Sequence, residues 1–339
     1  MKYTKIFILS FLIGSCLSAC ERNKEDFSGI YCINIQNMEM NIIQNGNNIT
    51  FTMQSQILVD GTGTVNGDTL RLHAFTQEAE DFISLLTFSK DRKSFSGPFQ
   101  IRDATDKITL EGILLGTKGE CIKYDIVSKG IPKFITKDFT QLSKIERISK
   151  FRSGFGHSFT DGSESCRNMK HYYNPYLTYR INDNVEIYSP VTGTILSVVN
   201  DGHGASIGLK NKQIQIRPDD QKAFVIVIFH CDPVSSSIIT GKKVQEGELL
   251  GYARMYYDDL KQYVTSFDIA VWVTTPLGPR LVPYFDTLKD EVFNSYISRG
   301  ALTRQDFTIT KESRDADPLT CDGESFVTNG TINNWVDLN

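Results

Sequence analysis

The sequence has 339 residues, of which 40% are hydrophobic and 22% are charged, and its formal net charge at pH 7 is -4. This mildly acidic charge is spread along the chain and excludes the basic patch on which nucleic-acid binding depends, so no nucleic-acid partner is expected. The length suits two domains rather than one.

Residues 1–19 are predicted to be a secretion signal. Lys2 and Lys5 precede an apolar run over residues 6–13. This run is too short to span a membrane as a stable helix, and the charged start followed by an apolar run is typical of a cleaved signal peptide.

The end of this signal, Leu17-Ser18-Ala19-Cys20, resembles the bacterial lipobox, in which the cysteine is lipidated and becomes the first residue of the mature protein. The resemblance implies a lipoprotein of the cell envelope, anchored to a membrane through Cys20. If the cell has two membranes, we expect the outer one, facing the periplasm. An ordinary signal peptide or an uncleaved anchor is the alternative. Residues 20–26 would then be the lipidated cysteine and a short polar tether.

Five further cysteines lie beyond Cys20, in a compartment that permits disulfides. They occupy positions 32, 121, 166, 231 and 321. Because five is odd, at most two bridges form and one thiol is left over. Cys32 and Cys121 bracket one segment and form a possible disulfide, and Cys166 with Cys321 is the other candidate pair.

Residues 27–122 are predicted to form a small antiparallel β barrel or sandwich. Alternating segments, such as residues 49–53 and 69–73, are separated by Asn45-Gly46 and by Asn66-Gly67-Asp68, which are typical hairpin turns. Further short apolar segments continue at a spacing of about ten residues. The pattern does not distinguish a barrel from a sandwich, and it contains no recognisable chemistry.

Residues 130–150 are predicted to connect the two halves through a helix. Leu142, Ile145 and Ile148 recur at helical spacing, and Asp138 is a candidate N-cap.

Residues 284–339 are predicted to form a C-terminal helix and an irregular tail. The segment 286–298 has helical periodicity and is followed by Arg299-Gly300, whereas the tail from Asp315 is acidic and rich in asparagine.

A candidate metal site begins in the stretch Gly154-Phe155-Gly156-His157-Ser158-Phe159-Thr160-Asp161. In an extended strand the His and the Asp would lie roughly 13 Å apart, whereas two ligands of one zinc ion must converge within a few Å. The glycines favour a loop that turns between them. We therefore interpret His157 and Asp161 as half of a metal site. A surface loop with an unrelated His and Asp is the alternative.

Two later strands carry polar groups at positions suited to a groove. Residues 224–229 are continuously apolar, as in a strand buried on both faces, and this run ends at His230. Along residues 266–273, alternate side chains point to opposite faces. One face carries Phe267, Ile269, Val271 and Val273, and the other carries Ser266, Asp268, Ala270 and Trp272.

Taken together, residues 154–273 resemble the lysostaphin or LytM-type zinc endopeptidases, which cut peptide cross-links in bacterial cell walls. The match rests on the order of four landmarks, which are His157-x-x-x-Asp161, the strand pair around Ser189-Pro190-Val191-Thr192-Gly193, Phe229-His230, and Gly241-x-x-Val244-x-x-Gly247-x-x-Leu250-Gly251. The resemblance implies a LytM-like antiparallel β domain over residues 151–283. Together with the predicted N-terminal barrel or sandwich and a few helices, it makes the expected fold of the whole chain all-β-dominated.

The resemblance also implies roles for single residues. His157 and Asp161 would be zinc ligands, and His230 would be a catalytic histidine. The family ends with His-x-His, whose second His is the third zinc ligand, and here Ser266 and Asp268 stand at these positions. Asp268 is therefore the expected third ligand, through a carboxylate oxygen.

The catalytic histidine that Ser266 replaces has one candidate substitute. His171 lies in the polar insertion over residues 163–183 and would swing into the site. Its alternative role is packing among the neighbouring tyrosines.

Two functions follow from these expectations. The first is a zinc metalloendopeptidase of the cell envelope that acts on peptidoglycan peptides. The alternative is a catalytically degenerate LytM domain that binds wall peptide or regulates a cell-wall amidase without cutting. At Ser266 the chain lacks a family histidine that could orient water or stabilise the oxyanion, and such a loss lowers the rate of hydrolysis by about 100- to 10,000-fold. The sequence therefore does not decide whether the domain is an active enzyme.

Overall fold

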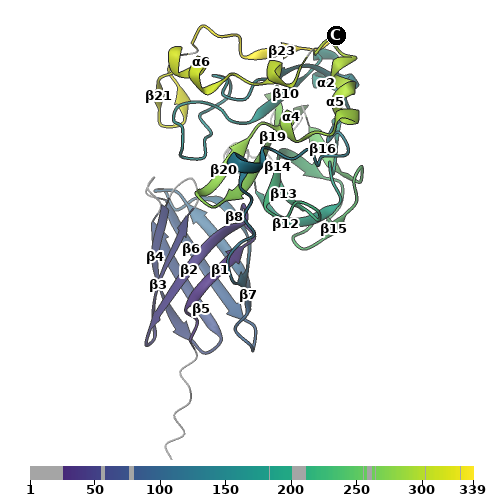
Figure 1. Ribbon diagram of the computed structural model, residues 1–339. Coiled ribbons are helices and arrows are strands. Elements are labelled where there is room, and N and C mark those ends of the chain that lie inside the picture. The colour runs from purple at the N-terminus through teal and green to yellow at the C-terminus, as the bar shows by residue number, and fades with distance from the viewer. Residues whose placement is uncertain are drawn as a thin grey trace, which may run out of the picture.

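The computed structural model describes residues 26–54, 58–75, 80–182, 184–200, 211–254, 256–257, 262–263, 265–301, 303–328 and 330–339. Antiparallel strands dominate, as predicted, and they form a barrel and a larger second domain that carries the helices (Figure 1). Cys20 and the signal segment lie outside the described residues. Within the described ranges, no helix has the length and apolar character needed to cross a membrane.

Eight strands close into the barrel. Each strand pairs with its neighbour in sequence, and β1 closes the barrel by pairing with β8. The first domain is therefore a barrel rather than a sandwich. Its strands are β1 (Gly29–Ile33), β2 (Met38–Asn45), β3 (Asn48–Gln54), β4 (Leu58–Asn66), β5 (Thr69–Phe75), β6 (Asp81–Phe88), β7 (Ser94–Arg102) and β8 (Ile108–Lys118).

Aromatic rings fill the barrel, because alternate side chains of every strand point inward. The buried rings are those of Phe27, Tyr31, Phe51, Phe82, Phe88, Phe95 and Phe99. Gly116 makes room for one of them, since a Cβ added there would lie 2.1 Å from the ring of Phe95. Gly46 and Gly67 have φ angles of 64° and 59°, as their predicted hairpin turns require. The barrel interior is thus a packed core.

The connection between the two parts differs from the prediction. A short helix α1 (Ile126–Lys129) precedes the predicted one. In place of a helix over residues 138–148, the chain forms a 3-10 turn η1 (Leu142–Lys144) and a strand β9 (Ile145–Ser149). Ile145 and Ile148 are buried, as expected, but they reach the core from a strand. Since β9 pairs on both sides with strands distant in sequence, long-range pairing overrides the local helical periodicity.

An 11-stranded sheet forms the second domain. Its main path runs β15-β12-β13-β14-β19-β10-β9-β23, with β20 beside β19, and with β16 joining β11 to β14. The bounds are β10 (His171–Pro175), β11 (Asn184–Tyr188), β12 (Gly193–Asn200), β13 (Lys212–Pro218), β14 (Phe224–Pro233), β15 (Lys243–Val244), β16 (Leu249–Arg254), β19 (Phe267–Thr275), β20 (Gly278–Val282) and β23 (Trp335–Asp337).

Smaller elements surround this sheet. Two short hairpins pair β17 (Tyr256–Tyr257) with β18 (Gln262–Tyr263) and β21 (Cys321–Asp322) with β22 (Ser325–Phe326). The helical segments are α2 (Leu177–Asn182), α4 (Tyr284–Thr287), α5 (Asp290–Ile297), η2 (Arg304–Phe307) and α6 (Lys311–Ala316). The helix predicted over residues 286–298 is present as α5.

The central strands β14 and β19 are buried on both faces. The predicted face of β19 with Phe267, Ile269, Val271 and Val273 lies in the main core, and Ala270 and Trp272 on the other face pack in a smaller cluster. The alternation predicted for this strand is therefore confirmed. Asp268 belongs to the face of the smaller cluster.

The C-terminal tail is more ordered than predicted. It forms α6, the β21–β22 hairpin and β23, and it crosses the top of the second domain in Figure 1. Trp335 pairs with Ser149 of β9, and Cys321 forms a disulfide with Cys166. These contacts lie far from the tail in sequence, so composition alone could not reveal the order they impose.

Polar side chains join the barrel to the second domain. Asn34 donates hydrogen bonds to the carbonyl oxygens of Ile113 in the barrel and Leu196 in β12, at 2.9 and 2.6 Å. Asn37 donates to the hydroxyl of Thr274 at 3.0 Å. Both asparagines are buried, so their amides need these partners. The turn between β1 and β2 therefore fixes the second domain on one end of the barrel.

Two disulfides close the long loops of the chain. Cys32 bonds to Cys121 beside the barrel, and Cys166 bonds to Cys321 in the second domain. Cys231 is a buried free thiol.

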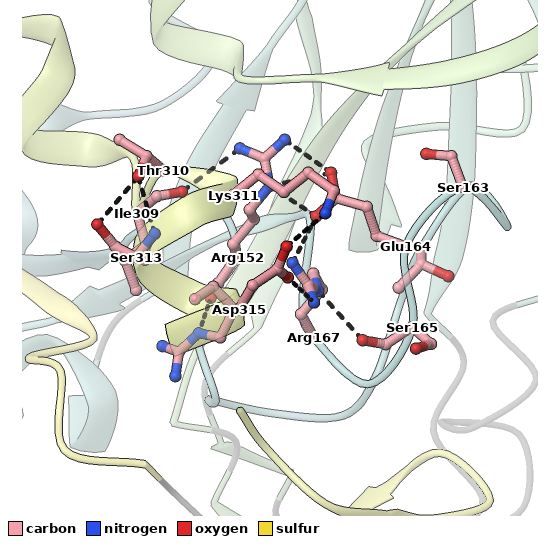
Figure 2. Close-up of polar contacts among 12 residues, drawn as sticks. Arg152, Ser163, Glu164, Ser165, Arg167, Ile309, Thr310, Lys311, Ser313 and Asp315 are labelled. Carbon is pink, nitrogen blue, oxygen red and sulfur yellow. Dashed lines mark hydrogen bonds and ion pairs between the residues drawn. The ribbon is translucent and has the colours of Figure 1, made fainter. Parts of the chain in front are cut away.

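An ionic network reinforces the second bridge (Figure 2). Glu164 accepts hydrogen bonds from Arg152 at 2.7 and 2.8 Å and from Arg167 at 2.6 Å. Arg167 also reaches Asp315 of α6, at 2.9 Å. The side chain of Glu164 is 6% exposed, and although burial opposes it, Arg152 and Arg167 hold its pKa below the usual value. The network ties residues 163–168 to the tail.

Asp138 carries a carboxyl group that is turned into a cluster of tyrosines. It hydrogen-bonds to Tyr296, whose hydroxyl lies 3.0 Å from that of Tyr173. Burial raises the pKa of Asp138 to about 6 from a usual 3.8. Between these pH values the folded protein holds a proton that the unfolded chain has lost.

We predict that Asp138→Asn stabilises the protein at neutral pH. The contribution of Asp138 to stability should fall as the pH rises from about 4 to about 6, by up to about 3 kcal/mol, because the folded state must give up its proton. The variant should unfold at higher urea concentration than wild type at pH 7.5 and at nearly the same concentration at pH 4.

Asp290→Asn provides the control for this experiment, because Lys133 and Arg304 lower the pKa of that exposed carboxyl group. This control should not be stabilised at pH 7.5. An equal effect of Asp138→Asn at both pH values would show that its carboxyl group does not titrate in the expected window.

A second prediction concerns the disulfide between Cys166 and Cys321. Changing Cys166 and Cys321 together to Ser should lower the free energy of unfolding by about 2 to 5 kcal/mol, since the bridge closes a long loop. Amide hydrogen exchange should rise over residues 163–170 and stay unchanged in the barrel strands. Cys231→Ala, which removes a thiol but no bridge, is the control. Unchanged exchange over residues 163–170 would mean that the ionic network alone holds the segment.

Candidate functional site

The candidate site lies where β10, β14 and β19 meet the loop around His157. β10 runs antiparallel to β19, with Tyr172 directly opposite Asp268. Opposite residues of an antiparallel pair share a face, and so do residues two apart in one strand. Tyr172 and Asp268 therefore project toward the same side of the sheet, and Lys170, in the bend just before β10, contacts Asp268 there.

Asp268 is the buried centre of the site, with a side chain that is 0% exposed. One carboxylate oxygen, Oδ2, lies 2.7 Å from Nζ of Lys170, and the other, Oδ1, lies 3.1 Å from Nε2 of His230. Burial alone would raise the pKa of Asp268. Lys170 and His230 outweigh this effect and hold the pKa well below its usual value, so the carboxylate is ionised.

Lys170 is almost completely buried, with a side chain that is 3% exposed. Its ammonium group bonds to Asp268, to Nε2 of His157 at 3.1 Å, and to the side chain of Tyr172. The nitrogen also lies 4.3 Å from the ring centroid of Phe229 and 4.6 Å from that of Phe159. Burial would lower the pKa of Lys170, but Asp268 and Tyr172 raise it above the usual value, so the group is charged.

The contact with Lys170 decides the tautomer of His157. An ammonium group only donates hydrogen bonds, so Nε2 of His157 must accept and Nδ1 must carry the proton. Nδ1 lies 3.1 Å from the carbonyl oxygen of Ser158 and 3.1 Å from a carboxylate oxygen of Glu324. His157 is 36% exposed. It is thus a neutral ring that joins the buried cation to the surface.

A β-bulge directs His230 toward Asp268. Between β13 and β14, the register shifts from Ile214 opposite Ile228 to Lys212 opposite Cys231, which adds one residue to β14. His230 lies in this bulge with a φ of 57°, an uncommon value for a residue other than glycine. Bulges re-aim side chains beside functional sites. The side chain of His230 remains 20% exposed while it contacts Asp268.

The carboxylate of Asp161 bonds to backbone N–H groups and not to the other residues of the site. Its Oδ2 accepts the backbone N–H of Leu281 in β20 at 2.8 Å, and its Oδ1 accepts the backbone N–H of Ser163 at 2.9 Å. Oδ2 therefore fixes the loop to β20, and Oδ1 fixes the turn of the loop at Ser163.

His171 lies on the opposite face of β10 from Lys170 and Tyr172. Its Nδ1 lies 2.9 Å from the carbonyl oxygen of Ser149, and its Nε2 accepts the backbone N–H of Tyr284 at 3.3 Å. Burial lowers the pKa of His171 to about 4, so the ring is neutral. In this structure both ring nitrogens of His171 are bonded within the core, so the ring does not lie in the site as the sequence analysis expected.

These residues do not fit the zinc site that the sequence resemblance implies. Lys170 lies between His157 and Asp268, and Asp161 is bonded to Leu281. Across the part of the chain that the structure describes, no three His, Cys, Asp or Glu side chains are placed to hold a metal ion together. The ammonium group of Lys170 thus lies between His157 and Asp268 and contacts both.

The sequence analysis missed Lys170. Its only local signal is a lysine in the otherwise apolar and aromatic run Met169-Lys170-His171-Tyr172-Tyr173, where a charge needs a buried partner. The partner itself is set by the register of β10 against β19, which no spacing in the sequence encodes.

No protein-family model and no curated protein match this sequence. Among solved structures, the chain is similar to Helicobacter pylori Csd3. The structure from the orthorhombic crystal is 11% identical with a TM-score of 0.32, and the match covers 77% of this chain and 81% of that chain. The structure from the hexagonal crystal is 12% identical with a TM-score of 0.27, covering 78% and 80%. At these identities and TM-scores, the likeness assigns neither a family nor an activity to this chain.

Proposed function

We propose that this protein is a cell-envelope lipoprotein whose second domain binds peptidoglycan peptide without cutting it. The observation that carries the proposal is the pairing of Asp268 with Lys170 and His230, which occupies both oxygens of the expected third zinc ligand. The resemblance of residues 154–273 to LytM-type endopeptidases supplies the class of ligand.

The chemistry of the site favours binding over hydrolysis. Hydrolysis of an amide by this class depends on a metal that activates water, with a second group to orient the water or to stabilise the oxyanion. Here the expected ligand Asp161 braces β20, His171 is buried in the core, and Ser266 replaces the family's histidine. Asp161 and His171, which would have to act together with the metal, are therefore each bonded to other parts of the domain.

Two histidines of this site have partly exposed side chains, His157 at 36% and His230 at 20%. His157 carries its proton on Nδ1, beside the carbonyl oxygen of Ser158 and a carboxylate oxygen of Glu324. Nε2 of His230 contacts Asp268. Wall peptides present carboxylate and amide groups, which are suitable partners for N–H donors of this kind.

The barrel suits a role as a spacer. The turn after β1 bonds to the second domain, so the start of β1 at Gly29 lies toward the other end of the barrel. With a lipid on Cys20, the barrel would stand between the membrane and the binding domain. Six of the eight barrel strands, β2 to β7, have seven to nine residues, which sets a separation of roughly 20 to 30 Å.

We predict that the full chain, purified in mild detergent, co-sediments with isolated cell-wall sacculi and releases no soluble peptide from them. Co-sedimentation should be unchanged by a metal chelator. His157→Ala and His230→Ala should each weaken binding by about tenfold, the loss expected for one hydrogen bond to a charged group. The matched control is His73→Ala, which removes a half-exposed histidine paired with Asp81 on the barrel.

The same assay separates the competing outcomes. Chelator-sensitive release of wall peptide would establish the peptidase and overturn the binding proposal. Wild-type protein that stays in the supernatant would exclude wall peptide as the ligand. Equal losses in His73→Ala and His230→Ala would place the binding surface elsewhere.

A further inference from the structure

We infer that the ammonium group of Lys170 is a resident cation that takes the place of a divalent metal ion. With the ammonium group in place, His157, Asp268 and His230 are not positioned to hold an ion together, and its removal would let them close around one. The inference concerns the site's own chemistry and stands whether or not the domain binds wall peptide.

The first support is that the buried ammonium group meets polar partners on several sides. It lies 2.7 Å from Oδ2 of Asp268 and 3.1 Å from Nε2 of His157, and it bonds to the side chain of Tyr172. Two aromatic faces, those of Phe229 and Phe159, flank it at distances suited to cation–π contact. These contacts in a buried place distinguish a built cation site from a surface lysine that meets an acid by chance.

The second support is the chemistry of the acceptors. A neutral imidazole nitrogen and a carboxylate oxygen are the donor atoms that zinc and similar ions prefer. Here both point at one atom, Nζ of Lys170, from 3.1 and 2.7 Å. Zinc ligands of these kinds lie at about 2.0 to 2.2 Å, so shifts of about 1 Å or less would bring both atoms to an ion at that point.

The third support is the position of His230. It contacts the second oxygen of the same carboxylate, and a bulge in β14 turns it there. His230 is therefore the nearest further nitrogen ligand for an ion beside Asp268, and its strained backbone is explained by this placement.

Lys170 and a metal ion exclude each other. Both need the same oxygen of Asp268 and the same nitrogen of His157, and the lysine side chain is 3% exposed. A divalent ion beside a buried ammonium group would also bring like charges together in a medium of low dielectric constant. Wild-type protein should therefore bind no metal at this site, and removing the lysine head group should open it.

The experiment compares cobalt and zinc binding by the full chain in wild-type, Lys170→Ala and Lys170→Met forms. Cobalt gives a visible absorption band on tetrahedral coordination, and zinc affinity follows from competition with a chromophoric chelator. We expect one equivalent to bind to Lys170→Ala at least about 100-fold more tightly than to wild type. Lys243→Met removes the charge of an exposed lysine and should behave as wild type.

A double variant, Lys170→Ala with Asp268→Ala, identifies the ligands and should lose the gained site. Thermal unfolding provides a second measurement if the single variants are unstable. Zinc or methylammonium should raise the midpoint of Lys170→Ala, because each replaces the missing cation, and neither should raise that of wild type.

Two results would overturn the inference. One is a wild-type metal site that disappears in Asp268→Ala. The other is a folded Lys170→Ala protein that binds zinc no better than wild type and gains no stability from methylammonium. Neither result depends on sacculi, so failure here and failure of the wall-binding proposal can be told apart.

Discussion

The buried carboxylate of Asp268 is the constraint on which the site depends. An ionised carboxylate at 0% exposure is costly unless charged and hydrogen-bonding partners compensate for the water it has lost. Lys170 and His230 supply these partners. The register of β10 against β19 brings Lys170 to one oxygen, and the bulge in β14 brings His230 to the other. One regular strand pairing and one bulge of the sheet thus position the partners of a single side chain.

The C-terminal tail belongs to the same arrangement. Residues 163–168 lead directly into Lys170, and they are held by the Cys166–Cys321 bridge and by the ionic network around Glu164. The tail also adds β23 to the free side of β9. A segment that composition describes as irregular therefore supports the strand that presents the buried cation.

The sequence was informative where structure is local. The hairpin turns at Gly46 and Gly67, the alternation along β19 and the helix α5 could all be predicted from patterns of a few residues. It was misleading where distant strands compete with local preference, as in β9. The site shows the same limit. Spacing drew attention to His157, Asp161 and Asp268, but the bond from Asp161 to Leu281 and the entry of Lys170 depend on long-range register.

Charge balance explains why the departures from a zinc site occur together. With His157 neutral and Asp161 bonded to β20, Asp268 is the one anion among the described residues that contacts the buried cation. A single ammonium group neutralises it, whereas a divalent ion would leave a positive charge in a buried place. If Asp161 turned back toward His157, the site would hold two anions, and a divalent ion would then suit it better than lysine. The bond from Asp161 to β20 and the burial of Lys170 beside Asp268 therefore satisfy the same charge balance.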